Sequence, residues 1–338
     1  MKEKRLDWLD VAKGFGILLV IFAHTDNSML RSLIYTFHVP LFFFLSGYVF
    51  SNKYDFKTFL VKKIKAIVVP YFLYGIPMII CQIFYFKSSG SMSPNSIMHL
   101  VKDFLVQNRM WTLWFIACLF WLNILFYWVE RLCRTYIKMG IAVIALLLCG
   151  ICYYNFGGSS LPWNVDICFM MIPFFFVGYV CKNYYDAIRG WINTVPKSVV
   201  LFIICLAINQ GLGLLSLHVS GTDVDIFHNK YGILPLTYIS AFAGIIGMII
   251  FSHWFIIRPI KYIGRHSMIY FAWHQHIFLT LVIDIFNLIG FTFNEAWPFL
   301  YRLGYNLLVD FIIVILITLC SFIIETVKKK ITHRSINS

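Results

Sequence analysis

The chain has 338 residues, of which 60% are hydrophobic, 19% aromatic and only 13% charged. Soluble domains carry about 25% charged residues, so this composition excludes a soluble enzyme and indicates an integral membrane protein. The formal net charge is +13, but the cations cluster in short segments between apolar runs. We therefore expect membrane lipids as partners and no nucleic acid.

Apolar runs recur along the whole chain, each close to the ~20 residues that a helix needs to cross the hydrocarbon core. Ten are expected, near residues 9–27, 33–51, 66–86, 111–130, 138–155, 163–181, 198–217, 233–256, 267–289 and 304–325. The predicted fold class is an all-α integral membrane protein with about ten transmembrane helices. Residues 1–338 are expected to form a single transmembrane domain, with no appended soluble domain.

The charge of the loops predicts the orientation, because cytoplasmic loops carry an excess of lysine and arginine. If the N-terminus is inside, the inner segments, including the loop 52–65, hold 22 of the 28 lysines and arginines. The outer side keeps six, namely Arg31, Lys87, Lys102, Arg109, Lys230 and Arg302. We therefore predict that both termini are cytoplasmic.

The first run contains the most informative pair, Lys13 and His24, with ten residues between them. On a helix, eleven steps of about 100° and about 1.5 Å bring the two nearly into line, roughly 16 Å apart. Lys13 then marks the cytoplasmic end and His24 lies in the outer half. His38, near the start of the returning second run, is expected in the outer half too. Titratable groups inside lipid are costly and are by default functional hypotheses.

These residues suit two tasks at opposite faces of the membrane. Histidine is suited to general-base work on a hydroxyl, because its pKa lies near neutral pH. Lys13 and the inner lysines, among them Lys62 and Lys65, suit the phosphates of a cytosolic nucleotide or coenzyme A. The alternatives stay open: a histidine in a membrane helix is often only a hydrogen-bond partner, and the lysines alone are typical positive-inside residues.

Further candidates lie in later runs. His274 and His276 fall near mid-membrane and point to different faces of a helix, so we expect at most one to share a site and no metal to bind between them. Trp114 is typical of an interfacial aromatic belt, although it also suits stacking on a sugar. Asn164 and Asp166 are candidate partners for sugar hydroxyls on the outer side.

Two strings near the N-terminus carry a family resemblance. Trp8-Leu-Asp10-Val-Ala-Lys13-Gly leads to His24, and Phe37-His38-Val-Pro-Leu-Phe-Phe-Phe-Leu-Ser46-Gly47 follows. They resemble the opening of the family 3 membrane acyltransferases, most of all the fucose 4-O-acetylase-like branch. Later segments agree, including Leu113-Trp114-Phe115 and Gly264-Arg-His-Ser267, so the similarity covers essentially the whole chain.

The resemblance implies a multi-pass protein of the bacterial cytoplasmic (inner) membrane. Such an enzyme moves an acyl group, commonly acetyl, from cytoplasmic acyl-CoA to a hydroxyl of a cell-envelope glycan or lipid-linked sugar. The family's signature of a cation, ten residues and a histidine falls on Lys13 and His24, and its paired arginines fall on Lys62 and Lys65. Lysine keeps the charge but loses the bidentate grip on phosphate.

Together these arguments predict acetyl-CoA as acyl donor, with its phosphates at Lys13, Lys62 and Lys65, and no metal. His24 acts as the base, and His38 shapes or shares the site. The predicted substrate contacts are Trp114, Asn164, Asp166 and His274.

The alternative class is a proton-coupled transporter or exporter of a small solute or polysaccharide precursor, because ten helices with buried histidine and aspartate also describe carriers. An inactive scaffold that tolerates loss of His24 is a third possibility. A transferase consumes acetyl-CoA and releases free thiol, whereas a carrier moves label across sealed vesicles without it.

Overall fold

A computed structural model of the chain describes residues 6–25, 29–192 and 194–336, which are helical between their loops and contain no β-strand. Ten helical segments are long and apolar enough to cross a membrane, which confirms the expected number. They are Asp7–Thr25, Leu30–Tyr48, Phe56–Ser88, Trp114–Cys133, Tyr136–Asn155, Pro162–Asn183, Val195–Ser220, Leu234–Trp254, Ser267–Leu288 and Phe299–Lys330. Lys2, Lys4 and Arg5, which the orientation argument counted as inner cations, lie outside the described residues.

The second span is two helices rather than one. After α1 (Asp7–Thr25), the chain forms α2 (Met29–Tyr35), turns at Thr36 and Phe37, and restarts as α3 (His38–Tyr48). Pro40 lies in the first turn of α3, where its missing amide breaks no intrahelical hydrogen bond. The break places His38 at the first position of a new helix.

The third span is longer than expected. It joins α4 (Phe56–Lys63), the π-helical turn η1 (Ile64–Val68) and α5 (Val69–Ser88) into one segment of 33 residues. The helix begins after Asp55, whose side chain accepts a hydrogen bond of 3.2 Å from the Thr58 amide and so caps the first turn. The prediction of a loop over 52–65 is therefore wrong from Phe56 onward, and Lys62 and Lys65 belong to a helix.

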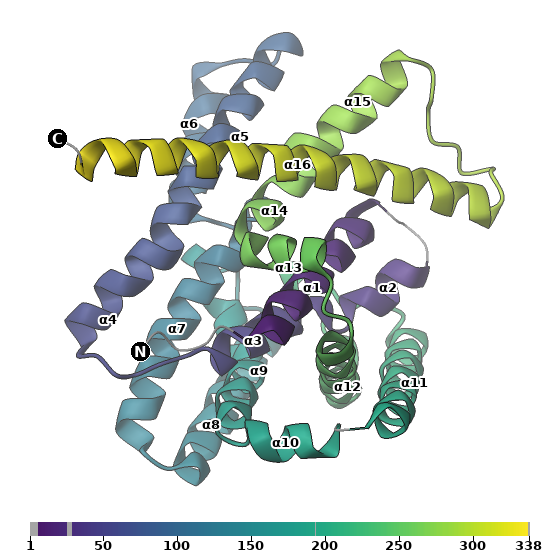
Figure 1. Ribbon diagram of the computed structural model, residues 1–338. Helices are drawn as coiled ribbons and strands as arrows, with labels where there is room; N and C mark the ends of the chain where they lie inside the picture. The colour runs from purple at the N-terminus through teal and green to yellow at the C-terminus, as the bar shows by residue number, and fades with distance from the viewer. Residues whose placement is uncertain (1–5, 26–28, 193, 337–338) are drawn as a thin grey trace.

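The other helices complete the bundle. They are α6 (Pro94–Val106), α7 (Trp114–Cys133), α8 (Tyr136–Asn155), η2 (Pro162–Asn164), α9 (Val165–Asn183), α10 (Tyr185–Trp191), α11 (Val195–Ser220), η3 (Ile226–His228), α12 (Leu234–Trp254), α13 (Arg258–Arg265), α14 (Ser267–Trp273), η4 (His274–Leu279), α15 (Thr280–Leu288) and α16 (Phe299–Ile336). Among the short ones, α6, α10, η3 and α13 lie in predicted loops, whereas α14, η4 and α15 together form the ninth predicted span. In Figure 1, α1 and α3 lie at the centre, α4 to α7 lie to one side, and α16 runs across the molecule.

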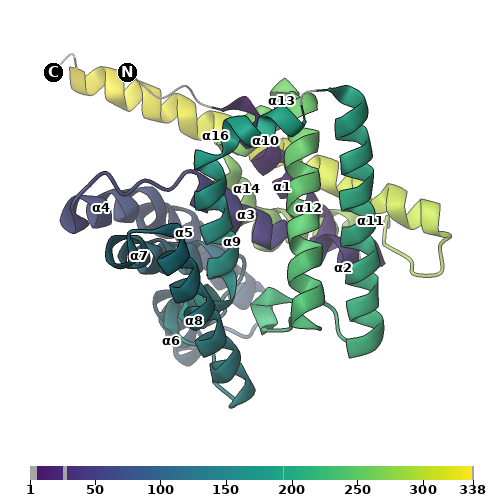
Figure 2. The ribbon, with the colours of Figure 1, turned by 90° about the horizontal axis from the view of Figure 1, so that it is seen from below.

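The beginning of α1 and the end of α16 lie at one end of the bundle. Figure 2 shows both at the same end as α10 and α13, and shows α11 and α12 side by side. An even number of crossings requires this arrangement. Which side of the membrane this end faces stays a prediction, based on the loop charges.

Glycines bring the central helices into close contact. The Cα of Gly47 in α3 faces the carbonyl of Phe175 in α9, and Gly178 in α9 faces the carbonyl of Phe44. At either position an added Cβ would overlap the opposite backbone oxygen. Small residues permit such close approach between membrane helices, so α3 and α9 pack almost backbone to backbone.

A second close seam joins α1 to α13. Gly14 in α1 lies against the carbonyl of Ile260, and Gly264 in α13 lies against the carbonyl of Asp10. The Asp10 carboxylate is buried and accepts a hydrogen bond of 3.1 Å from Arg265. This charge pair and the glycine contacts fix the beginning of α1, and thus the helix that carries Lys13 and His24.

Candidate functional site

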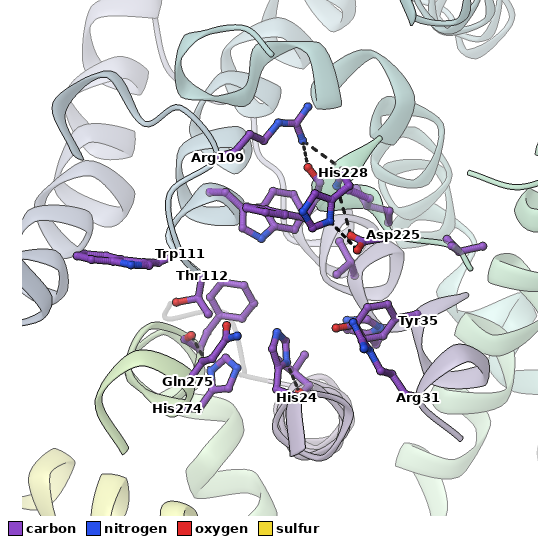
Figure 3. Close-up of a pocket in the computed structure, with 18 of the residues that line it drawn as sticks. His24, Arg31, Tyr35, Arg109, Trp111, Thr112, Asp225, His228, His274 and Gln275 are labelled. Carbon is purple, nitrogen blue, oxygen red and sulfur yellow. Dashed lines mark hydrogen bonds and ion pairs between the residues drawn. The ribbon is translucent and has the colours of Figure 1, made fainter. Parts of the chain in front are cut away.

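A cavity of about 420 Å³, here called the histidine cavity, lies where α1, α3 and η4 meet the loops before α7 and α12. Its lining is Val20, His24, Arg31, Tyr35, His38, Val39, Arg109, Trp111, Thr112, Trp114, Val224, Asp225, Ile226, Phe227, His228, Phe271, His274, Gln275 and His276. Five of these residues are histidines. Figure 3 shows His24 projecting from its helix into this space, with Asp225 and His228 across from it.

His24 and His38 are held in the same way. Nδ1 of His24 lies 2.7 Å from the Val20 carbonyl, and Nδ1 of His38 lies 2.9 Å from the Ile34 carbonyl. Because a carbonyl only accepts, Nδ1 donates in both rings, and the neutral imidazole keeps its lone pair on Nε2. Both predicted histidines therefore share one cavity with Nε2 as the basic atom.

His274 and His276 both line the histidine cavity, whereas we expected at most one of them to share a site. They do point in different directions. The ring of His274 lies 4.8 Å from that of His24 in an edge-on arrangement, whereas the ring of His276 lies 5.2 Å from that of Trp111. The cavity borders η4 on two sides. Helical periodicity shows that the two side chains point in different directions, but it does not show that both face the same cavity.

His274 is buried next to His24. Its Nδ1 lies 2.9 Å from the Phe271 carbonyl and 3.1 Å from the Tyr270 carbonyl. Its Nε2 is buried and has no hydrogen-bond partner among the described residues. A buried polar atom without a partner is costly, and it lies here beside the predicted base.

The sequence reasoning missed Arg31 and Tyr35 in α2. The Arg31 guanidinium lies 4.8 Å from the centre of the Tyr35 ring, whose centre lies 4.9 Å from that of His38. Arg31 was predicted only as one of six outer cations. Helical spacing relates Arg31 to Tyr35, because both lie on α2 four residues apart.

The four predicted substrate contacts divide evenly. Trp114 and His274 line the cavity, but Asn164 and Asp166 do not. The Asn164 amide donates to the Trp114 carbonyl at 3.3 Å. Asp166 is paired with Arg109 and accepts hydrogen bonds of 3.1 Å from the Leu161 amide and 3.0 Å from Asn229.

Asn164 and Asp166 are buried, and neither borders the histidine cavity. Their role as contacts for sugar hydroxyls stays a prediction. Arg109, which was counted only as an outer cation, does line the cavity.

The three lysines predicted to hold the donor lie outside the histidine cavity. Lys13 is on α1, eleven residues before His24. Lys62 and Lys65 lie on α4 and η1, which pack against α7 rather than beside Lys13. The Lys62 ammonium stands 3.2 Å from the centre of the Tyr54 ring, a cation–π contact. The structure therefore does not bring the three together.

Comparison with known proteins gives one match. No curated protein and no solved structure matches the chain. A family model described as an acyltransferase domain matches residues 6–326, nearly the whole chain. This extent includes both N-terminal motifs, nine candidate spans in full, the tenth up to residue 326, and every residue of the histidine cavity. The chain therefore belongs to the family 3 acyltransferases, a family of membrane acyltransferases.

Proposed function

We propose that this protein transfers an acyl group, acetyl in the simplest case, from cytoplasmic acyl-CoA to a hydroxyl of a cell-envelope glycan or lipid-linked sugar. The observation that carries the proposal is His24, whose Nδ1 is fixed by the Val20 carbonyl. Its Nε2 is then the basic atom of a ring that projects into a cavity lined by polar and aromatic side chains (Figure 3). This is the arrangement that a general base requires.

The chemistry follows from that atom. His24 Nε2 takes the proton of the acceptor hydroxyl while the hydroxyl oxygen attacks the thioester carbonyl carbon. The new C–O ester bond forms, the C–S bond breaks, and the imidazolium returns the proton to the departing thiolate. His38 and His274 border the same space and shape the position of the two substrates.

The main test is acyl transfer by membranes that contain His24→Ala. General-base catalysis contributes about 10²- to 10⁴-fold, so release of free thiol from acetyl-CoA should fall by at least about a hundredfold. His218→Ala is the matched control, because His218 is exposed on α11 and does not line the cavity. With equal protein abundance, normal turnover by His24→Ala overturns the proposal. Movement of label into sealed vesicles without thiol release favours a transporter.

The donor side of the proposal concerns Lys62 and Lys65, which we assign to the phosphates of coenzyme A. Support comes from the family motif and from their place near the predicted cytoplasmic end of the third span. Each is a point charge near the surface, so Lys62→Ala or Lys65→Ala should raise the KM for acetyl-CoA about two- to fivefold, and less at high salt. Lys57→Ala, exposed on the same helix, is the control. Equal effects at Lys57 and Lys65 contradict the assignment.

A further inference from the structure

The loop between α11 and α12, residues 221–233 and here called the roof loop, folds over the histidine cavity. The Asp225 amide donates to the Lys230 carbonyl at 2.7 Å, and the Lys230 amide donates back at 2.8 Å. This bridge closes a tight turn around η3. Val224 and Ile226 are buried, so their side chains hold the loop down. The loop is thus a fixed wall of the cavity facing α1.

The roof loop carries a charged pair. The carboxylate of Asp225 lies 2.7 Å from Nδ1 of His228, and its other oxygen accepts from the His228 amide at 3.3 Å. A carboxylate in this position fixes the imidazole as the Nδ1–H tautomer and leaves Nε2 to interact with a ligand. The His228 side chain is 60% exposed and that of Asp225 is 20% exposed, so both are accessible at the mouth of the cavity.

Arg109 holds the roof loop from behind. One of its guanidinium nitrogens donates to the Phe227 carbonyl at 2.6 Å, and the other pairs with Asp166. Asn229, which follows His228 at a positive φ of 56°, donates to Asp166 at 3.0 Å. Residues from the α6–α7 loop and α9 therefore fix the turn that carries Asp225 and His228. A binding group that is already ordered loses little entropy when a ligand arrives.

The charges of the cavity indicate what it accepts. The charge of Arg109 is balanced by Asp166 behind the wall. The other two charged residues of the lining, Arg31 and Asp225, have opposite signs, so the cavity carries no net charge when its histidines are neutral. Phe227 packs on Trp114 with ring centres 5.9 Å apart and adds apolar surface beside these polar groups. A neutral ring with several hydroxyls fits this lining better than an anion.

We propose that Asp225 and His228 recognise the acceptor by hydrogen bonds to hydroxyls adjacent to the one that is acylated. The acceptor is a neutral sugar ring whose C–H face lies against Phe227. Arg109 is a positioning residue, which acts by holding the loop. This inference rests on the proposed function, and it assigns the acceptor end of the reaction to a loop opposite His24.

The test separates acceptor from donor. Membranes with each variant are titrated with a cell-envelope glycan extract from the source strain lacking the gene, and thiol release from acetyl-CoA is measured. A hydrogen bond to a charged group corresponds to about a ten- to hundredfold change. Asp225→Asn should raise the half-maximal extract concentration by about tenfold and leave the KM for acetyl-CoA unchanged. Asp223→Asn is the matched control, since Asp223 is exposed on the same loop outside the cavity.

A second variant tests whether the effect of Asp225→Asn comes only from misfolding of the roof loop. His228→Gln keeps the Asp225 contact to the backbone and should also raise the half-maximal extract concentration. If Asp225→Asn and His228→Gln behave like Asp223→Asn, or if they raise both constants equally, the inference is wrong.

A binding measurement without acetyl-CoA distinguishes this failure from that of the proposed function. The extract should raise the thermal unfolding temperature of purified wild-type protein and of His24→Ala, but not that of Asp225→Asn. If the extract stabilises the protein but no thiol is released, the transferase proposal is wrong and the proposed binding site is still supported. If the extract stabilises the wild type and Asp225→Asn equally, the proposed role of Asp225 in binding the acceptor is wrong.

Discussion

At the scale of single residues, three histidines of the cavity are oriented by the same kind of hydrogen bond. His24, His38 and His274 each donate through Nδ1 to a carbonyl three or four residues earlier in the helix or turn before them. In each ring this leaves Nε2 as the acceptor. The backbone just before each histidine thus orients its ring without a carboxylate, which keeps charge out of the membrane interior. Only His228, on a loop, uses an aspartate for the same purpose.

The buried pair of Arg109 and Asp166 supports a prediction about stability. Asp166→Ala leaves the Arg109 guanidinium without its partner in a site where its side chain is 14% exposed. Removing one member of a buried pair costs about 3–5 kcal/mol, so the variant should unfold at lower temperature in detergent. The double variant Arg109→Met with Asp166→Leu leaves no uncompensated charge and should recover part of the loss.

Unfolding temperatures of the wild type, Arg109→Met, Asp166→Leu and the double variant give the coupling directly. Purely additive effects of the two single changes would show that the pair contributes no mutual stabilisation. The double variant should lose activity even where its stability recovers. The reason is that the roof loop loses the hydrogen bond that Arg109 donates to the Phe227 carbonyl.

At the scale of helices, the glycine seam between α3 and α9 determines the position of His38. Gly47 and Gly178 let the backbones meet, and an added methyl group at either would overlap a carbonyl oxygen that belongs to a helix. Backbone oxygens in a helix do not move aside as a flexible side chain does. The sequence motif around Ser46 and Gly47 is therefore required for packing as well as for the site.

Gly47→Ala should destabilise the protein by about 1–3 kcal/mol, the usual cost of overpacking. Gly211→Ala is the matched control, because Gly211 lies in the middle of α11 with open space around it. Alanine there should be neutral or stabilising by about 0.5–1 kcal/mol, since it restricts the unfolded chain and favours a helix. The thermal unfolding temperatures of the two variants in the same detergent check this contrast. Similar temperatures would mean that α3 and α9 can separate at little cost.

Much of the fold could be predicted from the sequence, because each crossing leaves an apolar run. What the runs do not show are interruptions within a span. The break at Thr36 and Phe37 and the π-helical turn that begins at His274 both lie inside continuous apolar sequence. The helix α6 escaped prediction because a short amphipathic segment between two spans reads as a loop.

The candidate site could be predicted where one helix carries it and not where distant loops complete it. The pairing of His24 with His38 follows from two consecutive helices and a turn. Asp225 and His228 enter the cavity from a loop about two hundred residues later, and only tertiary packing places them opposite His24. For the same reason, composition did not reveal that Asp166 lies behind the wall, paired with Arg109.

At the scale of the whole molecule, the loop charges predict the orientation in the membrane. We expect a cysteine introduced at Ser89, exposed after the third span, to react with a membrane-impermeant maleimide in intact cells. A cysteine introduced at Lys57, exposed in the first turn of that span, should react only after the membrane is made permeable. Cysteine-free protein is the control for background labelling. The reverse pattern would place both termini outside and move His24 to the cytoplasmic half.

The seam between α1 and α13 restricts how the two substrates meet. At Gly14 and Gly264 the helices leave no room even for a methyl group, so the pantetheine arm of an acyl carrier cannot pass between them. Lys13 lies one residue from Gly14, about 100° around the helix from the closed face. If the donor is an acyl-CoA, as we propose, its thioester would reach His24 along the flanks of α1 that face away from α13. The two glycines therefore close the interface between α1 and α13 to a ligand as effectively as bulky side chains would.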